Sequence, residues 1–308
     1  MAPLVTVLRR LAWIVVIGAV LVGGTGTPAP RTPRTPPTLG PYTILAADFH
    51  VHSFPGDGGL LPWDLVDEAR RRSLDVIALT NHNSMWSWDL AQRFGMTATD
   101  VMVLPGVEQT AAGYHMTAIG VHAPVAWRQS AASAASQIHE QGGVAIAAHP
   151  PGRWPEKWDT AAILIIDGVA AASSKVTIID SAPFTRRVMV RRPAIAAIGA
   201  SDFHYFAPIG VSRTYLFVTE RTRAGVLDAI RRGRTVACDG IGDTYGPAEL
   251  TAAVANECRR VATAPPAGSR SIDGLAAGAA WCGLVVLIAL GARERISFPG
   301  PAPPTAAP

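Results

Sequence analysis

Residues 44–52 of the chain have the sequence ILAADFHVH, an apolar run that ends in two histidines. Apolar runs of this length between glycine- and proline-rich turns predict a buried strand. Successive side chains of a strand point to opposite faces, so His50 and His52 should lie on one face and reach one cation together. The stretch therefore predicts a strand with metal-binding side chains at its carboxyl end.

More short apolar runs follow, and helical stretches lie between them. The expected strands are 44–49, 75–80, 101–108, 143–148, 161–169 and 194–200, with a hairpin at 114–121. The expected helices are 62–72, 130–141 and 222–232. Strands that alternate with helices predict an α/β domain with a parallel sheet. In such domains functional groups gather beyond the carboxyl ends of the strands.

Histidines and carboxylates follow most of these expected strand ends. Taken singly, each has a simpler explanation, since Asp57 lies in a glycine-rich turn and a lone His82 or Glu108 is typical of a loop. Together they supply six imidazoles and three carboxylates, enough for two or three divalent ions. The candidate metal ligands are His50, His52, Asp57, His82, Glu108, His115, His149, Asp202 and His204.

Other residues have weaker candidate roles. His122 and His139 lie outside the pattern and are interpreted as structural residues. Arg153 and Lys157 could reach an anionic substrate, although solvated surface positions explain them as well. Five tryptophans in the expected loops could line a pocket for an apolar leaving group or simply cover the core. They are Trp86, Trp88, Trp127, Trp154 and Trp158.

The motif series resembles that of the polymerase and histidinol phosphatase (PHP) family of metal-dependent phosphoesterases. The similar segments are Asp48–His52 with Asp57 and Gly58, Thr80–Asn83, Pro105–Glu108, Ala148–Pro150, Ala200–His204 and Arg231–Ala237. The resemblance extends over about residues 46–239. It implies a distorted (β/α)7 barrel with a binuclear or trinuclear site in its mouth.

The resemblance also implies how the ligands are shared. One ion would be bound by His50, His52, Glu108 and Asp202, a second by Glu108, His115 and His149, and a third by Asp57, His82 and His204. Zn, Mn or Fe would be the metal, and Glu108, Asp202 and His204 would be the catalytic residues.

Asn81 departs from the family pattern, which has an aspartate before this histidine in most members. That aspartate generally orients a metal ligand. An amide can still accept a hydrogen bond through its carbonyl oxygen, but it carries no charge. We therefore expect an altered metal affinity and not an inactive site.

These residues predict a metal-dependent hydrolase acting on a small-molecule ester, most simply a phosphoester. Divalent ions lower the pKa of a bound water from about 15.7 towards neutrality and polarise the oxygen of the scissile bond. Such a metal-activated hydroxide needs no protein nucleophile, and the sequence has neither a Gly-x-Ser-x-Gly elbow nor a Cys-His arrangement.

Two alternatives stay open. The Thr-Asn-His-Asn form at 80–83 resembles a branch related to carbamate hydrolases, so carbamate or carboxylic ester cleavage is a second candidate. A non-catalytic metal-binding ectodomain is the third. Nucleic acid is not an expected partner, because the net charge of +4 comes from scattered arginines. Nothing in the sequence predicts an oligomeric state.

The ends of the chain predict attachment to a membrane, because 49% of the residues are hydrophobic and only 16% are charged. We expect a signal peptide or signal anchor at 1–26, a Pro-rich tether at 27–41, the PHP-like domain at 42–240, a linker at 241–273, a transmembrane helix at 274–292 and a cytoplasmic tail at 293–308. Arginines beside both apolar runs place the domain outside the cytoplasm.

Cysteine use leaves one question open. Cys282 lies in the second apolar run, while Cys238 and Cys258 could pair in an oxidising compartment or stay as two free thiols.

Overall fold

The computed structural model describes residues 2–24, 35–95, 100–126, 128–150, 158–172, 182–205, 208–263 and 271–296. The chain divides into two compact units. The larger unit is Thr27–Ser269, and the smaller unit combines Met1–Gly26 with Arg270–Pro308.

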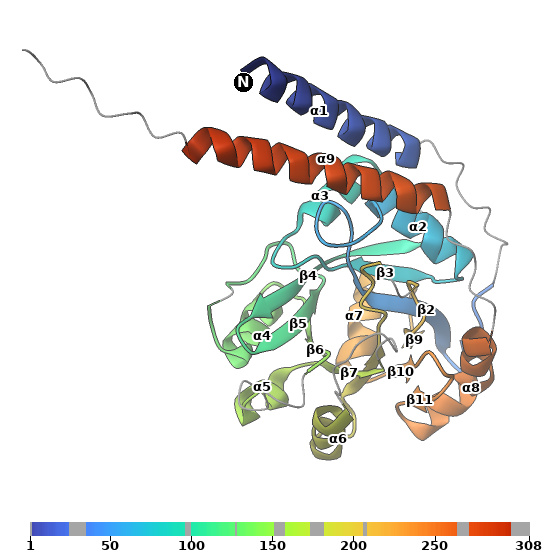
Figure 1. Ribbon diagram of the computed structural model, residues 1–308. Coiled ribbons are helices and arrows are strands. Elements are labelled where there is room, and N and C mark those ends of the chain that lie inside the picture. The colour runs from blue at the N-terminus through green and yellow to red at the C-terminus, as the bar shows by residue number, and fades with distance from the viewer. Residues whose placement is uncertain are drawn as a thin grey trace, which may run out of the picture. The chain divides into compact units, whose positions relative to one another are not determined.

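The larger unit is built on one mixed β-sheet (Figure 1). Its strands are β1 (Thr38–Leu39), β2 (Tyr42–Val51), β3 (Val76–Leu79), β4 (Met102–Ala111), β5 (Tyr114–Ile119), β6 (Val144–Ala148), β7 (Gly168–Ala172), β8 (Ala196–Gly199), β9 (Arg213–Val218), β10 (Thr235–Cys238) and β11 (Thr244–Tyr245). The order is β11-β10-β9-β2-β3-β4-β5-β6-β7-β8, and β1 pairs with β2. Pairing is parallel from β2 to β4 and from β6 to β8, and antiparallel at β5 and β9.

The two ends of the sheet come close together, so the sheet forms a nearly closed barrel. β8 lies beside β9 and β10, and a side chain joins them: Thr214 Oγ1 donates to Gly199 O at 2.8 Å and accepts from Gly199 N at 3.0 Å. A Cβ atom on Gly199 would lie 2.2 Å from the carbonyl oxygen of Arg213. Glycine therefore permits this close approach of the two strands.

Helices of the larger unit lie outside the sheet (Figure 1). They are α2 (Pro62–Arg71), α3 (Trp86–Arg93), α4 (Ala131–Glu140), α5 (Thr160–Ile165), α6 (Ala182–Arg191), α7 (Arg223–Arg231) and α8 (Ala248–Thr263). β2 is buried on both faces, with Leu45 and Phe49 in one apolar cluster and Ile44 and Ala46 in the other. The predicted α/β class is confirmed, and the strand expected at 44–49 lies within β2, between β9 and β3.

One predicted strand is wrong. Most of 161–169 forms α5, and the strand β7 begins only at Gly168. Asp159 caps the helix, because its side chain accepts a hydrogen bond from Ala162 N at 2.8 Å. A short apolar run has no periodicity that distinguishes a buried strand from a buried helix.

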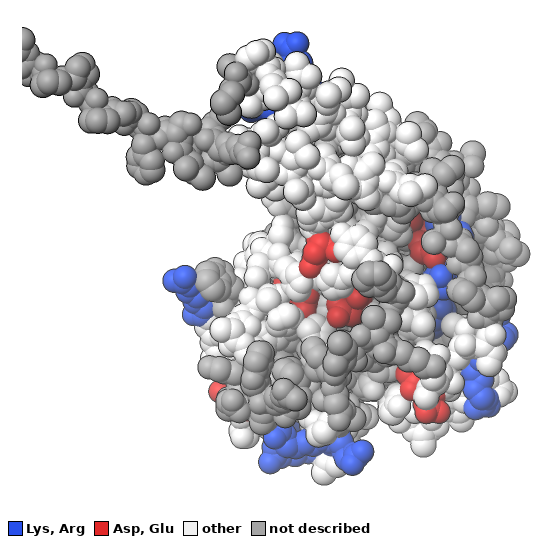
Figure 2. All heavy atoms as spheres, in the orientation of Figure 1, with Lys and Arg blue, Asp and Glu red and all other residues white. Residues whose placement is uncertain are grey.

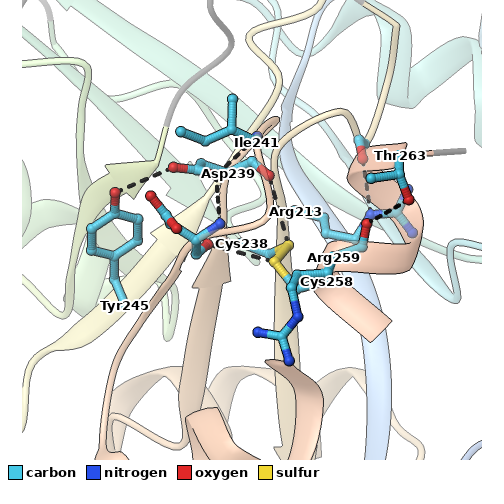
Figure 3. The surroundings of a disulfide bond; sticks show 10 residues. Arg213, Cys238, Asp239, Ile241, Tyr245, Cys258, Arg259 and Thr263 are labelled. Atoms are coloured by element: carbon cyan, nitrogen blue, oxygen red, sulfur yellow. Dashed lines mark hydrogen bonds between the residues drawn. A yellow bond between two sulfur atoms is a disulfide. The ribbon is translucent and has the colours of Figure 1, made fainter. Parts of the chain in front are cut away.

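The segment expected to be a linker, 241–273, is largely folded, since it contains β11 and α8. A disulfide between Cys238 and Cys258 joins the end of β10 to α8, with a Cα–Cα distance of 5.8 Å (Figure 3). Beside it, Asp239 Oδ1 accepts hydrogen bonds from the backbone of Ile241 and Asp243 at 3.0 and 2.9 Å. The open question about these two cysteines is thereby answered, and the domain extends beyond its expected end at 240.

The N-terminal boundary differs too. β1 lies within the expected tether 27–41 and pairs with the start of β2. The remainder of that tether, 27–34, lies outside the described residues.

In the smaller unit, α1 (Ala2–Gly24) packs against α9 (Ser271–Ile296). Small residues lie at the contact: Ala12 and Ala280 are buried, and a Cβ atom on Gly283 would lie 2.6 Å from Val16 Cγ2. Such residues let two helices approach closely.

Segment Pro3–Val22 of α1 is long and apolar enough to cross a membrane. The C-terminal transmembrane helix expected at 274–292 is not confirmed, because the apolar stretch found there, Gly278–Gly291, is shorter than a span requires. Residues 297–308 of the expected tail lie outside the described residues.

Candidate metal centre

All nine predicted ligands converge where strands of the barrel end. His50 lies in β2 and His52 directly after it, Glu108 lies in β4 and His115 in β5. The other ligands lie in loops: Asp57 after β2, His82 after β3, His149 after β6, and Asp202 and His204 after β8. An isolated parallel bridge between His82 and Glu108 continues the pairing of β3 and β4 into the site.

A first group of ligands surrounds Glu108, whose side chain is fully buried. We call this set, His50, His52, Glu108, His115, His149 and Asp202, the Glu108 group. Glu108 Oε1 lies 2.7 Å from His115 Nδ1 and 3.0 Å from His149 Nε2. Glu108 Oε2 lies 3.2 Å from Nε2 of both His50 and His52. The two oxygens thus face different sets of imidazoles, as in a carboxylate that bridges two cations.

Asp202 completes the buried group from the other side. Its Oδ1 atom lies 3.2 Å from His50 Nε2 and 3.6 Å from His52 Nε2. Its Oδ2 atom lies 3.8 Å from His149 Nε2. The side chain of Asp202 keeps 18% of its surface exposed, so it can meet solvent or a substrate.

A second, more exposed group surrounds Asp57 and is called the Asp57 group: Asp57, His82 and His204. Asp57 Oδ2 lies 3.1 Å from His82 Nε2 and 3.2 Å from His204 Nε2. The side chains of Asp57, His82 and His204 are 41%, 35% and 33% exposed. His52 lies between the two groups, because its Nδ1 atom is 3.0 Å from Asp57 Oδ1.

These side chains form four overlapping sets that could each hold a metal ion. The sets are His52, Asp57, His82 and His204; His50, His149 and Asp202; His50, His52 and Glu108; and His82, Glu108 and His115. Three details differ from the sharing that the resemblance implies. The first is that His149 forms a set with His50 and Asp202 and not with Glu108 and His115. His52 joins the Asp57 set, and His82 also approaches Glu108, with Nδ1 at 2.8 Å from Oε2.

Among the described residues, four buried atoms at the centre make no hydrogen bond of ordinary geometry: His50 Nε2, His52 Nε2, Glu108 Oε2 and Asp202 Oδ1. They point at one another across 3.2 to 3.6 Å. Buried polar atoms are normally paired, because leaving one unpaired costs about 1–3 kcal/mol. Nitrogen and carboxylate atoms arranged in this way fit a divalent cation between them.

Contacts between carboxylates and imidazoles dominate the electrostatics of the metal-free site. Burial alone would raise the pKa of Glu108, but His50, His115 and His149 hold it well below its ordinary value. Burial would lower the pKa values of His82 and His204, but contact with Asp57 raises them to about 10 and about 9. The carboxylates therefore stay ionised, while protons occupy imidazoles that a metal ion would need in neutral form.

Backbone conformation at the ligands is unusual. His149 and Asp202 have φ angles of 24° and 52°, in the left-handed region that non-glycine residues rarely adopt. Such conformations persist only where surrounding contacts hold them, and they are concentrated at functional sites.

Sequence reasoning did not assign a role to Asp48, whose carboxylate is fully buried behind the site. It accepts hydrogen bonds from Ser201 N at 3.1 Å, Gly210 N at 2.7 Å and His50 N at 3.2 Å. Burial raises the pKa of Asp48, and these hydrogen bonds oppose that shift. The carboxylate joins the end of β2 to the loop that carries Asp202, and an acidic residue inside an apolar strand was the available signal.

A cleft of about 560 Å³ opens beside the Asp57 group. It is lined by Pro55, Gly56, Asp57, Asn81, His82, Ser84 and Trp86. The Trp86 side chain is 68% exposed at this cleft, in agreement with the pocket-lining alternative for that residue. Figure 2 shows that, on the visible face of the larger unit, described Lys and Arg side chains lie mainly towards the margin.

The weaker candidates fall into three classes. His139 bonds to Asp167 at 2.7 Å and His122 is exposed, and neither belongs to a ligand set. Trp158 and Trp88 are buried core residues. Arg153, Lys157, Trp127 and Trp154 lie outside the described residues.

Comparison with known proteins gives a likeness in structure. Neither protein-family models nor curated proteins match the sequence. A solved two-domain protein from Bacteroides vulgatus, which contains a predicted PHP-like metal-dependent phosphoesterase, matches with a TM-score of 0.54 and 23% identity over 69% of each chain. The larger unit has a PHP-type fold. The resemblance drawn from the motifs is therefore confirmed at the level of the fold.

Two further structures are similar over about half of the chain. One is an amidohydrolase from Chromobacterium violaceum, with a TM-score of 0.42 and 18% identity over 51% of this chain and 87% of that one. The other is a candidate metal-dependent phosphoesterase from Bifidobacterium adolescentis, with a TM-score of 0.44 and 16% identity over 53% and 90%.

Proposed function

We propose that this chain is a metal-dependent hydrolase and that its substrate is a small-molecule phosphoester. The observation that carries the proposal is the set of four buried, unpartnered atoms that face one another between Glu108, Asp202, His50 and His52. A divalent ion held by these four atoms would satisfy them, and the sets around Glu108 with His115 and around Asp57 could hold further ions. Imidazole and carboxylate donors suit Zn, Mn or Fe.

Bound divalent ions would supply Lewis acidity and a water of lowered pKa. The protein's own groups would hold the reactants. Glu108 would keep its two oxygens facing separate imidazole sets, which fixes the spacing of the site. Asp202 would accept a proton at Oδ2, because its Oδ1 atom is held between His50 and His52 while Oδ2 lies at the longer distance of 3.8 Å from His149. The pKa of Asp202 is lowered against burial by His50 and His149, so the carboxylate is ionised at neutral pH.

His204 would contact the substrate from the exposed side. Its ring is one-third exposed, and its Nδ1 atom lies 3.0 Å from the backbone oxygen of Asp202. That contact fixes His204 relative to Asp202, which is the proposed base. His204 would thus orient the substrate relative to Asp202.

A carbamate or carboxylic ester is the second candidate substrate. The cleft beside Asp57 supports it, because Lys and Arg are absent from the described residues that line this cleft. A substrate arm that carries a further negative charge would meet no lysine or arginine among these described lining residues.

We also regard the sheet as a distorted (β/α)7 barrel. Seven strands, β2, β3, β4, β6, β7, β8 and β10, run in one direction, and β5 and β9 run against them. Functional residues of barrels lie at the carboxyl ends of the parallel strands, which is where the nine ligands lie.

The larger unit would lie outside the cytoplasm, anchored to the membrane. The Cys238–Cys258 disulfide supports this location, because disulfides persist in oxidising compartments. Packing of α1 on α9 supports a retained anchor over a cleaved signal peptide, since cleavage would remove the partner of Gly283. Amino-terminal sequencing of the mature protein tests retention, and protease added to intact cells tests location.

Elemental analysis and an ester panel test the activity. The detergent-solubilised full chain should contain two or three divalent ions and hydrolyse a nitrophenyl phosphate ester, and chelation should stop turnover until metal is restored. Faster hydrolysis of nitrophenyl acetate or a carbamate would select the second candidate. A metal-loaded protein that hydrolyses none of them would contradict an enzymatic role and favour a binding ectodomain.

A further inference from the structure

Asn81 is a buried residue at the lining of the cleft and bonds to the loop that leads to Asp57. Its Nδ2 atom donates to Ser53 O at 2.8 Å and to Pro55 O at 3.0 Å. Its Oδ1 atom accepts from Ser53 N at 2.9 Å. The partners determine which end of the amide is which, because Ser53 N can only donate and the two carbonyl oxygens can only accept.

This arrangement requires a side chain that donates twice and accepts once. An ionised carboxylate has the same shape but no donor, so aspartate at this position would turn an oxygen towards two carbonyl oxygens. A buried acceptor without a donor is costly, and two facing acceptors repel as well. Only an amide can accept a hydrogen bond from Ser53 N and also donate to both Ser53 O and Pro55 O.

The loop packs against Asn81 without free space. A Cβ atom on Gly56 would lie 1.8 Å from Asn81 Nδ2, and one on Gly58 would lie 2.1 Å from His52 O. Asp57 stands between these two glycines and contacts His52, His82 and His204. A shift of the loop at residues 55 and 56 would therefore move the carboxylate of Asp57.

A second link runs from the same loop to α3. Ser53 Oγ donates to Ser87 Oγ at 2.5 Å, and it also lies 3.4 Å from Asn81 Oδ1. The loop before Asp57 is thus held at Ser53 by two side chains that are themselves buried. At Pro55 the hydrogen bond from Asn81 holds it.

We propose that Asn81 is a positioning residue whose amide places Asp57 for the ion of the Asp57 group, and that aspartate cannot replace it. The inference rests on the proposed metal centre. It assigns to the uncharged residue at 81 a task that a carboxylate could not perform here. Loss of the amide would weaken the ion at Asp57 and leave the ions at Glu108 in place.

The test compares N81D with a matched control, N83D, in the full chain. Asn83 lies on the other side of His82, donates Nδ2 to Thr110 O at 3.0 Å and accepts from Thr110 N at 3.0 Å. N83D thus also removes the amide that donates to a carbonyl oxygen. That oxygen belongs to Thr110 in β4 and lies away from the Asp57 loop. N81S removes the donors without adding charge and serves if N81D does not fold.

Zn²⁺ content and affinity, measured by competition with a chelator, are the readouts. N81D and N81S should bind one ion about 10- to 100-fold more weakly than wild type, the usual effect of losing an outer-shell contact. The remaining ions should be unchanged, and N83D should bind every ion as wild type does. All three variants should melt at lower temperature, so melting alone does not identify the role.

Two results would overturn the inference: wild-type affinity for every ion in N81D and N81S, or the same selective loss in N83D. The readout does not depend on turnover. Selective loss of one ion in a protein that hydrolyses no ester would keep the role of Asn81 and reject the proposed activity. A wild-type chain that binds no Zn²⁺ would reject both.

Discussion

The Glu108 group and the Asp57 group use the same side-chain chemistry but are held in different ways. Three of the six ligands in the Glu108 group, His50, Glu108 and His115, lie in paired strands, where backbone ladders place them, and Glu108 is fully buried. Asp57, His82 and His204 lie in loops and are each at least one-third exposed. Strands position ligands through backbone hydrogen bonds, whereas loops depend on side chains such as Asn81. The comparison indicates a group centred on a buried carboxylate that a strand holds, beside a group that loops alone carry.

Removal of the central carboxylate should have the largest effect. In Glu108→Gln, the histidines of the buried group lose their shared anion, and burying their charge without a partner should cost about 3 kcal/mol in the metal-free protein. Metal content should fall by more than one ion and ester hydrolysis by more than about 100-fold. Elemental analysis and steady-state kinetics measure both. Wild-type metal content would contradict the bridging role.

Asp57→Asn should distinguish the two groups by the ions that they bind. It removes the one carboxylate of the Asp57 group, so one ion should be lost while those at Glu108 remain, with a fall in activity of about 10- to 100-fold. The metal-to-protein ratio measures the difference from Glu108→Gln. Loss of every ion in both variants would show one cooperative site and end the distinction between the groups.

Breaking the disulfide should affect stability and leave the site unchanged. Replacing Cys238 and Cys258 by serine frees a segment with a sequence separation of 20. The unfolded chain gains entropy, which should reduce the free energy of unfolding by about 3 kcal/mol. Denaturant unfolding measures this, with metal content as the control. A change in metal content would mean that α8 supports the centre.

Stability of the metal-free protein should fall as the pH rises. Asp57, with Glu108 at His82 and Asp202 at His204, raises the pKa values of these two histidines from 6.5 to about 10 and about 9. Their contribution is fully present below about pH 6.5 and is lost as the pH rises through 9 to 10. Unfolding in chelator across this range measures the loss, which should be smaller in Asp57→Asn. An equal loss in both proteins would contradict Asp57 as the cause.

His139→Ala should give the smallest effect and serves as the distant control. The imidazole bonds to Asp167 at 2.7 Å and is about one-third exposed. A pair of this kind contributes about 0.5 kcal/mol. Thermal unfolding should show a slight decrease, and metal content and ester hydrolysis should not change. A lost ion would place His139 within reach of the site.

Ligand identity could be predicted from the sequence because strand ends are local features. His50 and His52 follow an apolar run, and an aspartate–histidine pair follows another at 202 and 204. Parallel strands bring their carboxyl ends to one edge, so these residues had to meet if the sheet formed. The assignment of 161–169 as one strand failed because the capping of α5 by Asp159 was not recognised beside the apolar pattern.

Composition and strand pattern alone determined the α/β class, the nine candidate ligands and the apolar ends of the chain, since hydrophobic runs and residue types are properties of the sequence. Only the tertiary structure decided how those ligands divide into a buried and an exposed group, that Cys238 pairs with Cys258, and that Asn81 holds the Asp57 loop. Each depends on distances between residues 20 or more positions apart in the chain. No local pattern encodes such distances, because packing of the whole barrel sets them.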